Sequence, residues 1–79
     1  MNAEKSAQLN KVIADCFEVN VGVITPDTSF IKDLDASSLK RTVFVAELEE
    51  LTGSTISVAR IKKMETVSSL YEQLNEWLQ

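Results

Sequence analysis

The sequence predicts a single all-α domain over residues 1–79, with three main helices, one short helix and a long ordered loop between the first two. Three observations support this. Apolar residues recur at steps of three and four near both ends of the chain, as on the buried face of an amphipathic helix. No stretch alternates polar and apolar residues for long enough to form a sheet. The chain has only 79 residues, 44% of them hydrophobic, so it has room for one core.

The first predicted helix runs from Ala3 to about Val19. Asn2 precedes it and can cap its free backbone amides. Its apolar residues, which repeat at helical steps, are Leu9, Val12, Ile13, Cys16 and Phe17.

The next segment, residues 20–37, loses this period and collects turn-forming residues, including Gly22 and the stretch TPDTS. A loop of this length is usually functional or disordered. We expect an ordered loop with a short helical turn near Phe30 to Leu34, because the segment carries apolar side chains that can fold over a core. These are Val21, Val23, Ile24, Phe30, Ile31 and Leu34.

The second predicted helix runs from about Ser38 to Leu51, and Gly53 is placed to end it in a left-handed conformation. Its apolar residues form two stripes on adjacent faces. One stripe contains Phe44, Leu48 and Leu51, flanked by Val45, and the other contains Leu39, Val43 and Ala46. A small domain can bury only one stripe well, so the other is a candidate docking surface.

Two further helices complete the chain. A short one is expected from Val58 to Lys63, with Ile61 and Met64 facing inward. Thr66 then offers a cap for one continuous last helix. The apolar residues of that helix are Val67, Leu70, Tyr71, Leu74, Trp77 and Leu78.

The composition excludes several kinds of chemistry. The chain has no histidine and one cysteine, which excludes a Ser-His-Asp or Cys-His nucleophile and a metal site built from soft ligands. The net charge is −4 and the basic residues are scattered, which argues against nucleic-acid binding and favours basic protein partners. No segment resembles a signal peptide or a membrane span, and a single cysteine suits a reducing compartment, so we expect a cytoplasmic protein. We also expect a monomer that is not an enzyme.

Two adjacent serines, Ser37 and Ser38, stand where the loop meets the second helix. Capping of that helix is enough to explain a serine there. An attachment site is also indicated, because the spare apolar stripe begins at Leu39, directly after Ser38. A helix N-terminus also favours a negatively charged group such as a phosphate ester.

The stretch SFIKDLDASSLKRTVFVAELEELTG, with VITPDT before it and ISVARIKKMETVSSLYEQLNEWL after it, resembles the acyl carrier proteins over nearly the whole chain. That family has a phenylalanine, an Asp-Leu-Gly turn, an Asp-Ser-Leu triplet, a helix ending in glutamates, and a Thr-Val pair before the last helix. The corresponding positions are Phe30, Asp33 to Asp35, Ser37 to Leu39, Glu47 to Glu50, and Thr66 with Val67.

The resemblance implies a four-helix bundle of the acyl-carrier type. In such a bundle Ser38 carries 4'-phosphopantetheine, which a phosphopantetheinyl transferase donates from coenzyme A. Acyl intermediates are then held as thioesters on this arm and presented to acyl-transferring, acyl-activating or condensing enzymes of fatty-acid, lipid or polyketide biosynthesis. We expect partners to contact a surface made of Asp33, Asp35, Leu39, Lys40, Arg41, Val43, Ala46, Glu47 and Ile61.

Departures from the family pattern indicate a specialised rather than a housekeeping carrier. Ser37 replaces the aspartate of the triplet, Asp35 replaces the glycine, and the helix begins with the basic pair Lys40 and Arg41. We hypothesise that Lys40 or Arg41 meets an acidic partner or the phosphate of the arm, the alternative being two solvated charges without a role. Two other functions remain open at this stage: an aminoacyl or peptidyl carrier with the same arm, and a helical interaction module that is never modified.

Overall fold

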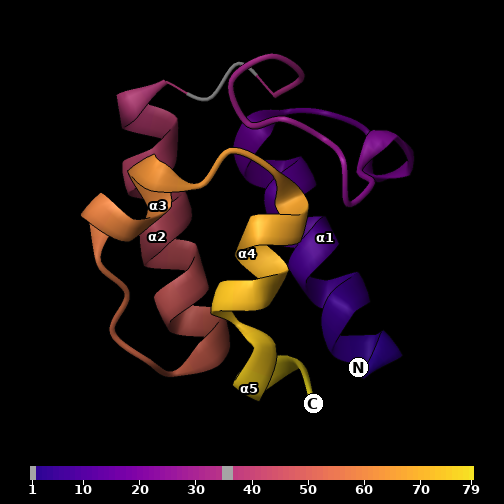
Figure 1. Ribbon diagram of the computed structural model, residues 1–79, viewed down its shortest axis with the longest axis vertical. Helices are drawn as coiled ribbons and strands as arrows, with labels where there is room; N and C mark the ends of the chain where they lie inside the picture. The colour runs from indigo at the N-terminus through magenta and orange to yellow at the C-terminus, as the bar shows by residue number, and fades with distance from the viewer. Residues whose placement is uncertain (1, 35–36) are drawn as a thin grey trace.

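The computed structural model describes residues 2–34 and 37–79 and shows a helical bundle (Figure 1). Its elements, in chain order, are α1 (Ala3–Phe17), the 3₁₀ helix η1 (Val21–Val23), α2 (Ser38–Thr52), α3 (Val58–Lys63), α4 (Val67–Gln73) and α5 (Asn75–Leu78). Within the described residues, extended pairing is limited to an isolated bridge between Ser29 and Thr66. The predicted all-α class is therefore confirmed.

Helix α1 begins as predicted, because the Asn2 side chain accepts a hydrogen bond from the Lys5 amide at 3.1 Å. The helix ends two residues earlier than predicted. Glu18 takes a left-handed conformation, with φ of 58°, and the Val19 amide bonds back to the carbonyl of Ala14 at 3.0 Å. This closing pattern satisfies the last carbonyls of the helix and turns the chain into the loop.

Helix α2 buries one of its two apolar stripes and exposes the other, as the sequence predicted. Phe44, Val45 and Leu48 lie in the core. Leu39 is 75% exposed, Val43 is 48% exposed, and Ala46 is also exposed. Gly53 ends the helix with φ of 71°, and its amide donates to the carbonyl of Glu49 at 2.9 Å.

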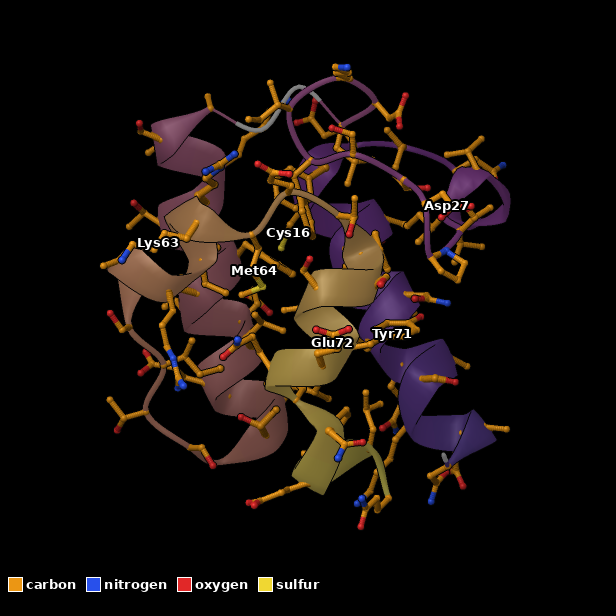
Figure 2. All side chains as sticks on the ribbon, viewed as in Figure 1. Cys16, Asp27, Lys63, Met64, Tyr71 and Glu72 are labelled. Carbon is orange, nitrogen blue, oxygen red and sulfur yellow. The ribbon has the colours of Figure 1, made fainter. Side chains whose placement is uncertain are left out.

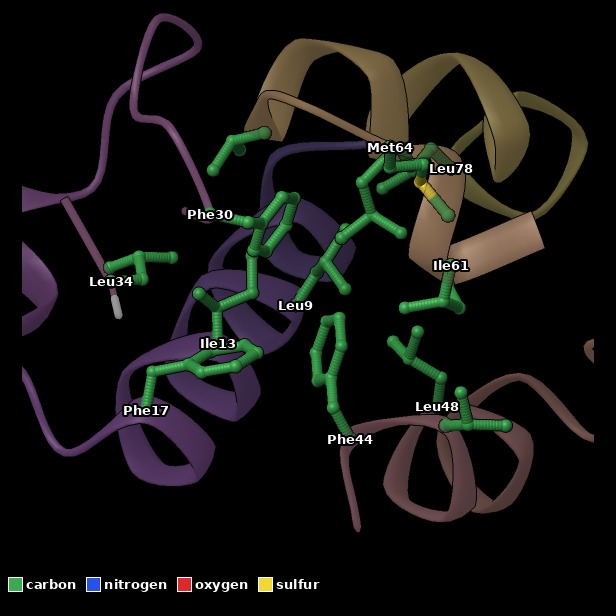
Figure 3. Packing of buried hydrophobic residues seen from close by; sticks show 13 residues of the cluster. Leu9, Ile13, Phe17, Phe30, Leu34, Phe44, Leu48, Ile61, Met64 and Leu78 are labelled. Atoms are coloured by element: carbon green, nitrogen blue, oxygen red, sulfur yellow. The ribbon is translucent and has the colours of Figure 1, made fainter. Parts of the chain in front are cut away.

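The core joins α1, the loop and α2 through three phenylalanine rings (Figure 3). The Phe17 ring lies 5.7 Å from that of Phe30 and 5.2 Å from that of Phe44, and the Phe30 and Phe44 rings are 6.1 Å apart. Tilted and edge-on pairs at this spacing add about 0.5–1.5 kcal/mol each beyond burial. The remaining helices close the core through buried residues that include Ile61, Met64, Val67, Leu70 and Leu78.

The long loop is ordered in its described part and packs on the start of α4. The Val67 amide donates to the carbonyl of Thr28 at 3.0 Å, and the Ser68 amide donates to that of Pro26 at 2.9 Å. The Thr66 hydroxyl accepts from the Ser69 amide at 3.3 Å. Loop carbonyls and one side chain thus satisfy three first-turn amides of α4, which would otherwise lack partners.

The predicted helical turn in this loop was misplaced. The 3₁₀ turn forms at Val21–Val23, where the Asn20 side chain accepts from the Gly22 amide at 2.8 Å. Residues 30–33 form turns without a helix. The amide at the second position after an asparagine is well placed for this bond, which explains the helical turn at Asn20.

The predicted continuous last helix is also corrected, because it breaks at Leu74 into α4 and α5. The C-terminal segment is held against the start of α1. The Asn2 amide donates to the carbonyl of Leu78 at 2.6 Å, and Lys5 Nζ donates to the carbonyl of Trp77 at 3.0 Å while lying 5.4 Å from the centre of its ring. Helical spacing in the sequence does not reveal such long-range contacts, which decide the direction of the last turn.

Candidate phosphopantetheine site and partner surface

Ser38 is the first residue of α2 and is exposed. The capping bond of that helix is made by its neighbour, because Ser37 Oγ accepts from the Lys40 amide at 3.2 Å. The two serines therefore have different roles at the same helix end. Capping occupies the hydroxyl of Ser37 and leaves that of Ser38 at the surface.

The surroundings of Ser38 suit a phosphate ester. The first amides of a helix lack intrahelical acceptors and carry a partial positive charge, which stabilises an anion by about 0.3–1 kcal/mol. The first turn of α2 contains no acidic residue that would compete for this position. A phosphodiester on Ser38 would meet these amides in a solvent-accessible place.

The described part of the loop leads into this site through a turn built around Asp33. One carboxylate oxygen of Asp33 accepts from the Ser29 amide at 2.7 Å, and Ser29 Oγ accepts from the Lys32 amide at 3.1 Å. Leu34, which follows, is buried at 2% exposure. Asp33 is exposed and stays available to a partner, but the structure also gives it a role in shaping the loop. Asp35, another predicted partner contact, lies outside the described residues.

The basic pair after Ser38 is split between two environments. Lys40 stays at the surface of α2 beside α1. Arg41 is only 9% exposed, on the same face of the helix as Phe44 and Leu48. Arg41 precedes the buried Phe44 and Leu48 by three and seven residues and so lies on the buried face, whereas Lys40 is turned about 100° away from it. The prediction that Arg41 is a surface contact is therefore wrong, as is the alternative that it is a solvated charge.

The residues predicted to contact partners differ in their exposure to solvent. Leu39, Val43, Ala46 and Glu47 are all exposed along α2. Ile61 is only 5% exposed and belongs to the core. Its selection as a partner contact is wrong, because α3 packs against α2 through the face that bears Ile61.

A shallow groove of about 530 Å³ lies between α1 and α2, next to Ser38. Helix α2 contributes Leu39, Lys40, Val43 and Glu47. The opposite wall, which the sequence interpretation missed, consists of Val12, Asp15, Cys16 and Glu18. The only signal for these residues is helical spacing, which does not say which neighbouring helix a face will meet.

Cys16 reports the electrostatics of this groove. Burial raises the pKa of its thiol above the ordinary value of 9.0, and the negative charges of Glu47 and then Asp15 raise it further. The thiol is thus kept protonated at neutral pH, which argues against a nucleophilic role.

A second cleft, of about 580 Å³, lies at the far end of α2 from Ser38. It is bordered by Thr52 and Ile56 on one side and by Leu70 and Trp77 on the other. Thr52 lies fourteen residues after Ser38 along α2, a rise of about 21 Å at 1.5 Å per residue.

Comparison with known proteins settles the family. Residues 7–74 match the family model described as "Phosphopantetheine attachment site". The chain belongs to the acyl carrier protein family. It is 38% identical to an acyl carrier protein of Lactobacillus acidophilus over 76% of this chain and 75% of that protein. It is 32% identical to the acyl carrier protein of Rubrobacter xylanophilus over 96% and 95% of the two chains. It is also 30% identical to "Polyketide-8 synthase acyl carrier protein 2" of Streptomyces avermitilis over 90% and 82%.

Family membership determines the cofactor and the kind of activity. The cofactor of this carrier is covalently attached 4'-phosphopantetheine. Acyl carrier proteins are non-catalytic, so this chain is not an enzyme. In the part of the chain that the structure describes, no helix is both long and apolar enough to cross a membrane.

Proposed function

We propose that Ser38 is the attachment point of 4'-phosphopantetheine and that the chain carries acyl groups for partner enzymes of fatty-acid, lipid or polyketide biosynthesis. When bound, the arm supplies a terminal thiol on which acyl groups are held as thioesters. The residues of the chain position the arm and present it to partners, while chemistry takes place on the partner enzymes.

The observation that carries this proposal is that Ser37 and Ser38 have different roles at the start of α2. Ser37 accepts the capping hydrogen bond, so Ser38 can be esterified without loss of the cap. Ser38 is also exposed, as a residue must be to enter the active site of a transferase. Two similar proteins, one named an acyl carrier protein and one named an acyl carrier protein of a polyketide synthase, support the proposed function of carrying acyl groups.

Co-expression with a broad-specificity phosphopantetheinyl transferase tests the proposal. We expect the intact mass to increase by one phosphopantetheine, and fragmentation of the modified peptide to place the group on Ser38. An unchanged mass would contradict carriage of the arm. Modification at Ser37 would show that the wrong serine of the pair has been chosen.

We further propose that this carrier serves dedicated partner enzymes. Lys40 supports this, because it places a positive charge at the surface close to Ser38. Such a charge favours an acidic contact on the transferase or on another partner. Replacing Lys40 with glutamate should slow loading by the native transferase of the source organism, measured as the initial rate of mass gain. An unchanged rate and unchanged partner binding would remove Lys40 from the recognition surface.

A further inference from the structure

Buried side chains occupy the end of the core that lies next to the attachment site. The buried face of α2 begins one turn after Ser38 with Arg41 and continues with Phe44, Val45 and Leu48. Side chains of a helix lean towards its N-terminus, so Arg41 extends over the turn of α2 that carries Ser38. Arg41 is only 9% exposed, and it therefore lies where this turn meets the apolar core.

Beyond Arg41, three phenylalanine rings fill the core between α1, the loop and α2 (Figure 3). The Phe44 ring lies 5.2 Å from that of Phe17 and 6.1 Å from that of Phe30, and each of the three residues is at most 4% exposed. Aromatic rings at these separations are in direct contact, and protein interiors are close-packed. An alkyl chain could therefore enter between the rings only by pushing them apart.

We propose that Arg41 and Phe44 close the core to the carried group, so that this carrier holds short or polar acyl groups outside its helices. The inference rests on the proposed attachment at Ser38. Each CH₂ group that stays in water is unfavourable relative to burial in an apolar core. A position outside the helices therefore suits a short acyl group, or one whose hydroxyl or keto groups are hydrated, better than a long saturated chain.

Charged groups make two routes to a buried position unfavourable for an alkyl chain. The guanidinium group of Arg41 stays protonated in proteins, and a chain lying against it would remove this charge further from water. The cleft at the far end of α2 has an apolar floor that includes Met64, but Arg60, Glu72 and Glu76 border it. Figure 2 shows Glu72 on α4 and Met64 directly after α3. An alkyl chain would have to pass these charged groups to reach the floor.

The test compares two loaded forms of the full chain, made with a broad-specificity phosphopantetheinyl transferase from butyryl- and octanoyl-coenzyme A. On a hydrophobic-interaction column we expect the octanoyl form to elute later, because its longer alkyl chain is exposed. The midpoints of thermal unfolding should agree within about 1 °C. The methyl NMR signals of Ile13, Leu48, Met64 and Leu70 should coincide in the two forms. Co-elution, a midpoint several degrees higher for the octanoyl form, or shifted methyl signals would show a buried chain and overturn the proposal.

Substitutions of the two closing residues sharpen the test. Phe44→Ala leaves a cavity that the octanoyl chain should enter, so octanoyl loading should raise the unfolding midpoint of this variant by several degrees relative to butyryl loading. Leu78→Ala, which removes a buried side chain at the opposite end of the molecule, is the matched control and should show no such gain.

Phe44→Leu leaves a smaller cavity and replaces Phe44→Ala if that variant does not fold. Adding Arg41→Ala to Phe44→Leu should increase the gain, because the chain then no longer has to pass the guanidinium group. An unchanged gain would exclude Arg41 from the closure. No gain in a folded Phe44 variant, or an equal gain in the Leu78 control, would overturn the role of Phe44.

The mass of each loaded form separates this proposal from the attachment proposal. A chain that gains no mass contradicts attachment, and the closure falls with it, whereas a loaded chain with a buried octanoyl group contradicts the closure alone. The substrate class is tested on the loaded chain purified from its source organism with the thioester intact. We expect the mass of a short or oxygen-bearing acyl group. A saturated chain of about ten carbons or more would overturn the proposal.

Discussion

At the scale of single residues, the adjacent serines illustrate how position decides a role. Both have a hydroxyl and both are exposed, yet only Ser37 has the extended backbone of a cap, with φ of −70° and ψ of 165°. Ser38 already lies within the helix. The sequence places the pair at a helix start, and the backbone then distinguishes them.

Replacing Ser37 with alanine should lower the free energy of unfolding by about 1 kcal/mol, because the Lys40 amide loses its acceptor. Loading by the transferase should persist. Replacing Ser38 with alanine should do the reverse, abolishing the mass gain with little change in stability. Urea denaturation and intact mass measured on both variants check the assignment, and a swap of the two phenotypes would contradict it.

Cys16 provides a prediction about pH. Burial and the nearby carboxylates raise the pKa of its thiol, so alkylation by iodoacetamide should be slow at neutral pH and should accelerate only above the ordinary pKa of 9.0. Removing both charges with D15N and E47Q should shift the midpoint of the rate profile to lower pH. The remaining burial should keep the midpoint above its ordinary value. A midpoint at or below 9.0 in the unsubstituted chain would contradict the described electrostatics.

The raised pKa values of buried groups also make the stability of the fold depend on pH. Burial also raises the pKa of Tyr71, whose hydroxyl donates to Asn10 on α1. Because the folded chain holds both protons more tightly than the unfolded chain, this stabilisation is complete below pH 9.0 and is lost as the pH rises through the raised values. Urea midpoints measured from pH 7 to 11 should therefore decline above about pH 9.

At the scale of elements, α2 shows how one helix can hold the core and present a surface. Its buried row of Phe44, Val45 and Leu48 and its exposed row of Leu39 and Val43 were both predictable from spacing. Which row would be buried depended on the side chains that α1 and the loop bring into contact with α2. The larger aromatic row fills the space between Phe17 and Phe30.

The end of α2 supplies an element-scale prediction. Gly53 has φ of 71°, and a Cβ there would meet no atom within 4 Å, so the cost of a side chain is backbone strain alone. Gly53→Ala should lower the free energy of unfolding by about 1 kcal/mol. Gly53→Asn should cost less, because asparagine tolerates this conformation better. Equal losses in thermal or urea unfolding would argue against strain as the cause.

At the scale of the whole molecule, the loop between α1 and α2 links distant parts of the chain. It contributes Phe30 to the core and carbonyls to the start of α4, and it leads to the attachment site at the start of α2. The buried residue Thr28 stabilises the conformation of this loop. The Thr28 hydroxyl accepts from the Thr25 amide at 2.8 Å and donates to the carbonyl of Val23 at 3.2 Å.

Replacing Thr28 with valine keeps the shape of the side chain but removes both bonds. We expect a loss of about 1–3 kcal/mol in unfolding free energy, because two backbone groups lose their partner. Amide exchange should accelerate at Thr25 and also at Val67 and Ser68, whose acceptors lie in the loop. Thr55→Val, at an exposed position outside this loop, is the matched control and should change stability little. Unchanged exchange at α4 in the Thr28 variant would contradict coupling between the loop and that helix.

Local chemistry in the sequence determined the helix starts at Asn2 and Thr66, the end at Gly53, the position of Ser38 at the head of a helix, and the family pattern. These features depend on neighbours within a few residues, so spacing and residue type are enough to predict them. Tertiary structure alone decided that Arg41 and Ile61 are buried, that the last helix breaks at Leu74, and that α1 joins α2 in an acidic groove. Each of these depends on contacts between segments far apart in the chain, and helical periodicity carries no information about which faces will meet.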